Sequence, residues 1–173
     1  MIERTQRRLR QAQFFYEHLL DPPRTTTIGS EAFLFYHNAF IQAARSVTWT
    51  LKNEEPENWK AWEPKWRAKR TLDEQELLDI TNELRIVEAK KGGANLYVEM
   101  AQEALEITHP DSRTTQATLR LNISFHYFED GKKKQEVTDV CRRYLELLEK
   151  MVKDFCTDMG LNAGNECRLG PYL

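Results

Sequence analysis

The sequence of 173 residues contains little cysteine, glycine or proline: three, seven and six residues, respectively. Cys141, Cys156 and Cys167 show no C-x-x-C spacing, which gives no support to a cysteine zinc site or a small disulfide-stapled fold. Cys141 and Cys156 fall in one predicted helix, about 22 Å apart at 1.5 Å per residue, and are too distant for a disulfide. We therefore expect reduced thiols, as in the cytoplasm.

Long apolar runs are also missing. No stretch approaches the roughly 18 consecutive apolar residues that a membrane-spanning helix needs. The arginine-rich segment 1–10 is not followed by the apolar run and cleavage site of a secretory signal. The 25 basic and 27 acidic residues nearly cancel, with a net charge of −2. These features predict a cytoplasmic protein that does not associate with a membrane.

Motifs of common enzymes and cofactor sites are absent as well. The four histidines, His18, His37, His109 and His126, are far apart in sequence and form no H-E-x-x-H motif, so we expect no metal site. No G-x-S-x-G, Walker-type or G-x-G-x-x-G motif occurs, and we expect no cofactor. His37 lies beside an apolar helical stripe and is interpreted as a buried, hydrogen-bonded core residue.

Apolar residues at spacings of three and four dominate most of the chain and predict helices. Pro56 is suited to the start of the third helix, and Pro64 is expected to kink or shorten it. The capping box Thr71-x-x-Glu74 begins the fourth helix, and Gly92-Gly93 ends it. The predicted helices span about residues 2–20, 31–53, 57–70, 71–92 and 136–158.

The period changes to two after residue 94. Apolar and polar residues alternate strictly over 119–127, which predicts a half-buried strand. Alternation from Leu96 to Met100 favours a strand there too, although 101–105 also fits a helical turn; we favour a two-stranded hairpin over 94–128. The predicted fold class is therefore mainly α, an up-and-down bundle of about five helices with a β-hairpin inserted before the last long helix. One domain covers 1–159, and 160–173 form a C-terminal tail.

Trp59, Trp62 and Trp66 recur on one face of the third helix. Such a face either stacks nucleic-acid bases or packs into a core or a dimer interface. The basic residues of segment 65–70 either contact phosphates or form a solvated face. The aromatic load, to which Trp49 adds, favours a homodimer in which a twofold contact covers one apolar patch with its own copy.

Three segments together carry a resemblance to a known family. A stretch from Phe35 to Trp49 that contains A-F-I-Q-A-A-R-S-V-T is followed by the tryptophan-rich helix and then by Asn82-Glu83-Leu84-Arg85. This order resembles bacterial HEPN-like helical proteins over about residues 1–95. The resemblance implies a helical bundle that often dimerises, in a superfamily with many RNA-cleaving toxins and defence proteins.

The resemblance also implies where an active site would lie. HEPN ribonucleases pair an arginine, often followed by asparagine, with a histidine four to six residues later. Arg85 matches the arginine, but Ile86 follows it and the histidine window holds Lys90, Lys91 and Gly92. A lysine with an ordinary pKa is protonated at pH 7 and is a poor general base. Arg85, Lys90 and Lys91 are therefore candidate anion- or RNA-binding residues, and no catalytic residue is assigned.

Two candidate functions follow from the resemblance and from the missing histidine. The first is a non-catalytic HEPN-like protein that binds a partner protein or nucleic acid, in a toxin–antitoxin or phage-defence setting. The alternative is a metal-independent ribonuclease that uses Arg85 with a histidine from elsewhere in the fold, such as His37, or with Lys90 at a lowered pKa. The missing histidine favours the first function.

Overall fold

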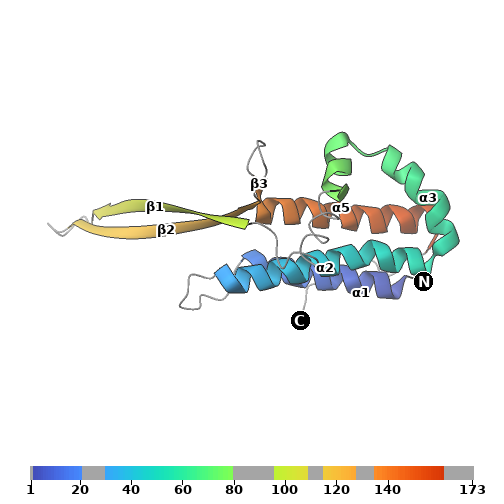
Figure 1. The fold of residues 1–173 in the computed structure, drawn as a ribbon, viewed down its shortest axis with the longest axis horizontal. Coiled ribbons are helices and arrows are strands. Elements are labelled where there is room, and N and C mark those ends of the chain that lie inside the picture. Colours follow the sequence, from blue (N-terminus) through green and yellow to red (C-terminus); the bar gives the residue numbers. More distant parts are fainter. Residues whose placement is uncertain (1, 21–29, 80–95, 109–114, 128–134, 162–173) are drawn as a thin grey trace. The chain divides into compact units, whose positions relative to one another are not determined.

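The computed structural model describes residues 2–20, 30–79, 96–108, 115–127 and 135–161. Helices dominate these residues, and the prediction of a helical bundle with a β-hairpin before the last long helix is confirmed (Figure 1). The hairpin and the helices form two compact units of the chain. The five helices among the described residues are α1 (Glu3–Leu20), α2 (Ser30–Glu54), α3 (Pro56–Ala68), a helix described over 72–79, and α5 (Val137–Asp158).

Three long helices, α1, α2 and α5, lie side by side in the helical unit (Figure 1). Tyr16 on α1 contacts Phe40 on α2, with ring centroids 6.1 Å apart, and the start of α1 contacts the end of α2, so these two helices are antiparallel. The Gln13 Nε2 atom donates to Glu149 Oε1 on α5 at 2.7 Å. Helices α2 and α5 run in the same direction (Figure 1).

The core consists of the stripes that the sequence predicts. Phe33, Phe40 and Phe155 are buried, whereas Tyr36, three residues after Phe33 on α2, is half-buried. Cys141 and Cys156 are buried thiols on α5, as the spacing indicated. The remaining core residues on α2 and α5 are Ile41, Ala44, Val47, Leu51, Val137, Val140, Tyr144, Leu147, Leu148, Met151 and Val152.

Helix ends follow local sequence signals. Pro56 occupies the first turn of α3, and α3 continues past Pro64 to Ala68, so Pro64 does not stop the helix. The predicted capping box is present: the Thr71 backbone N–H donates to Glu74 Oε2 at 2.9 Å, and the Glu74 N–H donates to Thr71 Oγ1 at 3.2 Å. The bond from Thr71, more than any other interaction, lowers the pKa of the Glu74 carboxyl. At the end of α5, Gly160 has a φ of 62°, a conformation that favours glycine.

Glu54, at the end of α2, caps the first turn of α1. Its carboxylate accepts from the backbone N–H groups of Arg4 (2.9 Å) and Thr5 (3.0 Å) and from the Thr5 hydroxyl (2.6 Å). The first N–H groups of a helix have no partner within the helix, so this carboxylate satisfies two of them and opposes the positive end of the helix dipole.

We expect Glu54→Ala to lower the free energy of unfolding by about 2 kcal/mol, because it leaves buried Thr5 and two helix N–H groups without their acceptor. Urea denaturation of both proteins measures the difference. Glu57→Ala, an exposed change in the first turn of α3, serves as the control and is expected to cost under about 0.5 kcal/mol. Equal losses for the two variants would contradict the capping role of Glu54.

The hairpin unit consists of β1 (Leu96–Thr108) and β2 (Thr115–Tyr127), with β3 (Gln135–Glu136) beside β2. β1 and β2 pair antiparallel over their whole length, from Leu96 opposite Tyr127 to Thr108 opposite Thr115. β3 adds two antiparallel pairs, and the strand order is β1-β2-β3. The strand assignment for 96–108 is therefore confirmed, and the helical turn considered for 101–105 does not form.

Several predicted features lie outside the described residues. They are the Gly92-Gly93 helix stop and the tail beyond residue 161. None of the described helices is long and apolar enough to cross a membrane.

Candidate functional site

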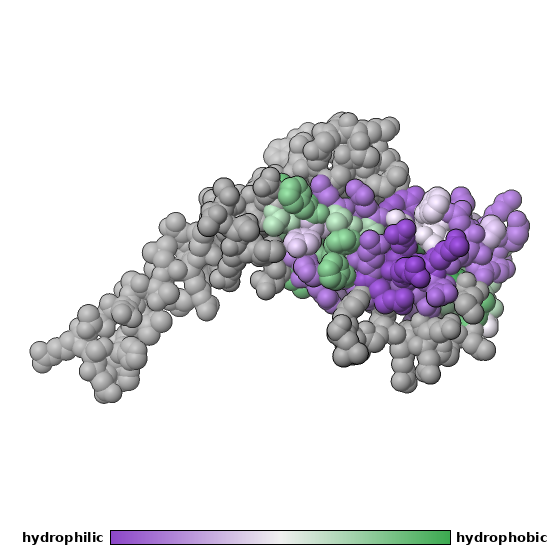
Figure 2. Space-filling model, turned by 90° about the horizontal axis from the view of Figure 1, so that it is seen from below, coloured by the Kyte–Doolittle hydropathy of each residue, from purple (hydrophilic) through white to green (hydrophobic). Residues whose placement is uncertain are grey.

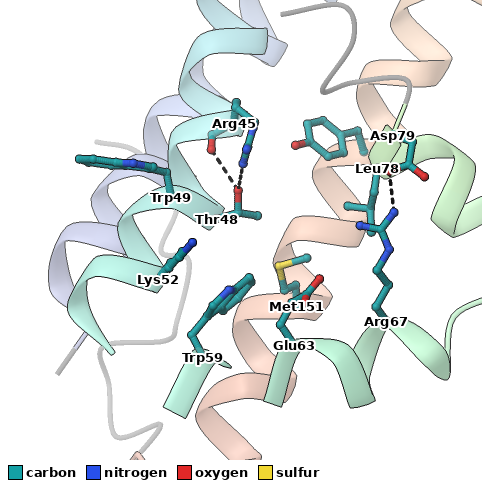
Figure 3. Close-up of a pocket in the computed structure, with 11 residues that line it drawn as sticks. Arg45, Thr48, Trp49, Lys52, Trp59, Glu63, Arg67, Leu78, Asp79 and Met151 are labelled. Carbon is teal, nitrogen blue, oxygen red and sulfur yellow. Dashed lines mark hydrogen bonds and ion pairs between the residues drawn. The ribbon is translucent and has the colours of Figure 1, made fainter. Parts of the chain in front are cut away.

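A hollow of about 340 Å³ opens between α2, α3, the 72–79 helix and α5, all within the helical unit (Figure 3). Its wall includes apolar side chains, Leu78 and Met151, but charged and aromatic side chains surround them. The volume is at the lower end of the range for small-molecule sites, which is about 300–1,000 Å³. This hollow, called the pocket below, is the candidate site.

Helix α2 contributes one wall through residues at spacings of three and four. Arg45, Thr48 and Lys52 lie toward the pocket, whereas Trp49 lies at its rim and points away from it (Figure 3). The Arg45 Nη1 atom donates to Thr48 Oγ1 at 2.6 Å, which holds the guanidinium along the helix. Lys52 is exposed and forms no ion pair with a described residue. This wall is therefore cationic.

Helix α3 contributes the facing wall. Trp59, Glu63 and Arg67 are four residues apart, so their side chains occupy one face of the helix and lie toward the pocket (Figure 3). Trp59 and Glu63 are half-buried. The rest of the tryptophan face is turned into the bundle: Trp62 packs edge-on against Phe155, with ring centroids 5.1 Å apart.

An ion pair closes one side of the pocket. The Arg67 Nη2 atom lies 2.6 Å from Asp79 Oδ1 and joins α3 to the 72–79 helix. The two side chains are 36% and 65% exposed, and exposed pairs contribute only about 0–1 kcal/mol, so an anionic ligand can compete for Arg67 at low cost. Three cationic side chains, Arg45, Lys52 and Arg67, and two carboxylates, Glu63 and Asp79, line the pocket. The pocket therefore combines a positive balance with an aromatic surface.

His37 lies in the core. It is fully buried on α2, and its Nδ1 atom is 3.3 Å from Asn38 Oδ1. Burial lowers the pKa of the imidazole to about 4, so the ring is neutral at pH 7. The prediction of a buried core histidine is confirmed. No histidine lines the pocket among the residues that the structure describes.

The structure separates the sequence-predicted site residues. Trp59 lines the pocket, whereas Trp62 and Trp66 are buried and donate their indole N–H groups to Asp158 (2.7 Å) and Asp154 (2.9 Å) on α5. Core packing is the role of these two indoles. Trp59 is half-buried and packs against Trp62 and Phe155, with ring centroids 5.9 and 6.4 Å apart, and of the three tryptophans it is the one that lines the pocket. Arg85, Lys90 and Lys91 lie outside the described residues.

The basic residues of segment 65–70 also lie in different surroundings. Arg67 reaches the pocket, and the guanidinium of Arg70 lies over the Trp66 ring at 4.6 Å, while Lys65 and Lys69 are solvent-exposed. The solvated-face interpretation therefore holds for the two lysines.

Sequence reasoning missed three pocket residues, Arg45, Lys52 and Glu63. The sequence does carry a signal for them. On α3, the spacing of four places Trp59, Glu63 and Arg67 on one polar stripe. On α2, the spacing of seven places Arg45 and Lys52 on another. Because α2 and α3 also carry apolar stripes, only the packing of the helices reveals that the two polar stripes face each other.

The fold and the pocket define a class, a helical bundle with a polar, partly aromatic pocket. No family model, curated protein or solved structure matches the chain.

Proposed function

We propose that this protein is a non-catalytic, HEPN-like module that binds single-stranded RNA in the pocket. The observation that carries the proposal is the joint presence of Trp59 and the cations Arg45, Lys52 and Arg67 around a pocket of about 340 Å³. Unpaired bases stack on aromatic side chains, and phosphates are attracted by arginine and lysine. Arg85, Lys90 and Lys91, the anion-binding candidates from the sequence, lie outside the described residues, and the proposal does not rest on them.

Among the described residues no histidine lines the pocket, and this supports binding rather than cleavage. Metal-free RNA cleavage needs a group that takes the 2′-hydroxyl proton, most often a histidine with a pKa near 7. The burial of His37 and its pKa of about 4 argue against its use with Arg85. The ribonuclease alternative then rests on another histidine or on Lys90. A toxin–antitoxin or phage-defence setting, and action in the cytoplasm, remain part of this proposal and rest on the resemblance and on the buried thiols of α5.

Fluorescence anisotropy with labelled single-stranded RNA tests the proposal. We expect saturable binding that weakens as salt rises, and about tenfold weaker binding for Trp59→Ala, because a stacked base contributes roughly 1–3 kcal/mol. Lys52→Ala is expected to weaken binding and to reduce the salt dependence by about one phosphate contact. Lys153→Ala, an exposed change on α5 outside the pocket, is the matched control and should bind as the unaltered protein does.

Two results would count against this function. Absence of salt-sensitive binding would remove RNA as the ligand and leave a partner protein as the candidate. Cleavage of the RNA that is lost in Arg85→Ala would establish the ribonuclease alternative.

We also propose that the chain forms a homodimer. Large apolar side chains are exposed where the end of α1 meets the start of α2: Phe14, Leu20, Leu34 and Phe35, the last with 65% exposure. Figure 2 shows apolar surface gathered on one part of the helical unit, while hydrophilic residues cover much of the rest of the visible face. Exposed apolar patches of this kind are typical of interaction surfaces, and a twofold contact covers such a patch with its own copy.

Analytical ultracentrifugation at micromolar concentration is expected to give a mass of about 41 kDa, twice the 20.4 kDa of one chain. Phe35→Asp places a charge in the exposed patch and should shift the mass toward that of one chain. A mass near 20 kDa for the unaltered protein would contradict the dimer.

A further inference from the structure

Glu63 places a carboxylate in the wall of the pocket, where its negative charge would repel an anionic ligand. Glu63 is half-buried, is one helical turn from both Trp59 and Arg67, and lies toward the pocket (Figure 3). It forms no ion pair with a described residue, although the cationic wall of α2 faces it. A ligand that pairs with both walls brings hydrogen-bond donors to Glu63 and negative charge to the α2 wall at Lys52.

A guanine nucleotide has this combination. The Watson–Crick edge of guanine presents two adjacent N–H donors, the ring N1–H and the exocyclic amine, and the two oxygens of one carboxylate accept from both. Adenine and cytosine each present one donor next to an acceptor, and uracil presents one donor between two acceptors. A carboxylate opposite any of these bases places an acceptor against an acceptor. One hydrogen bond is then not formed, and the binding free energy is less favourable.

We infer that the pocket selects guanine: the base stacks on Trp59, the Glu63 carboxylate accepts from its N1–H and amine, and the phosphate lies toward Arg45 and Lys52. The spacing along α3 supports this arrangement, because one turn separates the stacking residue from the carboxylate. Arg67, a further turn along, is held by Asp79 at 2.6 Å and is kept from neutralising Glu63. The inference rests on the proposed function and names the base that the same pocket prefers.

The test measures binding of the four nucleoside monophosphates and of a mixed-sequence single-stranded RNA to the full chain. We expect guanosine monophosphate to bind about tenfold or more tightly than the adenosine, cytidine and uridine monophosphates, since a carboxylate acceptor left unmatched in the complex costs about that factor. Inosine monophosphate, which keeps N1–H but lacks the amine, should fall between guanosine monophosphate and the rest.

Two variants isolate the role of Glu63. Glu63→Gln replaces one acceptor oxygen by a donor and should abolish the preference for guanine, while circular dichroism and the melting temperature confirm that the variant is folded. Glu57→Gln, an exposed change on the same helix and outside the pocket, should keep the preference.

The outcomes separate the inference from the function on which it rests. If the protein binds the mixed RNA but binds all four nucleoside monophosphates with equal affinity, the guanine inference is overturned and the RNA-binding proposal stands. A guanine preference that persists in Glu63→Gln would overturn it as well. Absence of binding to the RNA and to all four nucleotides would overturn both.

Discussion

Trp66→Ala is expected to lower the free energy of unfolding by about 3–5 kcal/mol, the range for truncating a buried tryptophan. Trp66 is 4% exposed and stacks on Trp62 with ring centroids 5.5 Å apart. Its indole N–H donates to Asp154 at 2.9 Å, and the guanidinium of Arg70 covers the ring. The change therefore creates a cavity, removes a hydrogen bond from α5 and exposes a stacked cation.

Trp49→Ala is the matched control, because it removes the same side chain from a position that is 64% exposed. We expect a loss of under about 1 kcal/mol for this variant. Trp66→Phe keeps most of the ring but not the N–H group, and should fall between the two because it retains packing and loses the bond to Asp154. Urea denaturation of the three variants gives the comparison. Equal effects of Trp66→Ala and Trp49→Ala would contradict the assignment of Trp66 to the core.

The stability of the protein should fall by roughly 3 kcal/mol between pH 7.5 and pH 4, owing to His37 alone. Burial lowers the pKa of His37 from 6.5 to about 4 in the folded protein. Above pH 6.5 the ring is neutral in both the folded and the unfolded chain, and it contributes no pH dependence. As the pH falls from 6.5 toward 4, only the unfolded chain takes up the proton, so the folded state loses stability over this window.

Urea denaturation at a series of pH values, for the unaltered protein and for His37→Gln, measures this contribution. Glutamine does not titrate, so the variant should lack the part of the pH dependence between 6.5 and 4, whatever its stability at pH 7.5. Parallel stability curves for the two proteins over this range would contradict a buried, neutral His37.

The helical fold could be predicted from the sequence because each helix carries its own signal. The apolar stripe that includes Phe33 and Phe40 identifies α2, and the Thr71–Glu74 capping box fixes where the next helix begins. The strict alternation of 119–127 likewise predicts β2, whereas the sequence of its partner strand also fits a helical turn over 101–105. The spacing of apolar residues along the chain determines these elements, and this spacing can be read directly from a sequence.

The pocket could not be predicted in the same way. Arg45 and Glu63 belong to different helices, and nothing in either helix indicates that the two side chains line one hollow. The three tryptophans illustrate the same limit: Trp62 and Trp66 donate their indole N–H groups to Asp158 and Asp154 on α5, whereas Trp59 packs against Phe155 on α5 and also lines the pocket. Pairing between helices distant in sequence decides the site, and a single sequence does not display that pairing.

The central claim, that the pocket binds RNA without cutting it, is tested most directly by photo-cross-linking. Single-stranded RNA that contains 4-thiouridine is irradiated with the full chain, and mass spectrometry identifies the cross-linked residue. We predict a cross-link on Trp59 or its neighbours in α3, with the RNA recovered at full length. Cross-links confined to segments outside the pocket, such as 96–127, or RNA recovered as fragments would contradict the account.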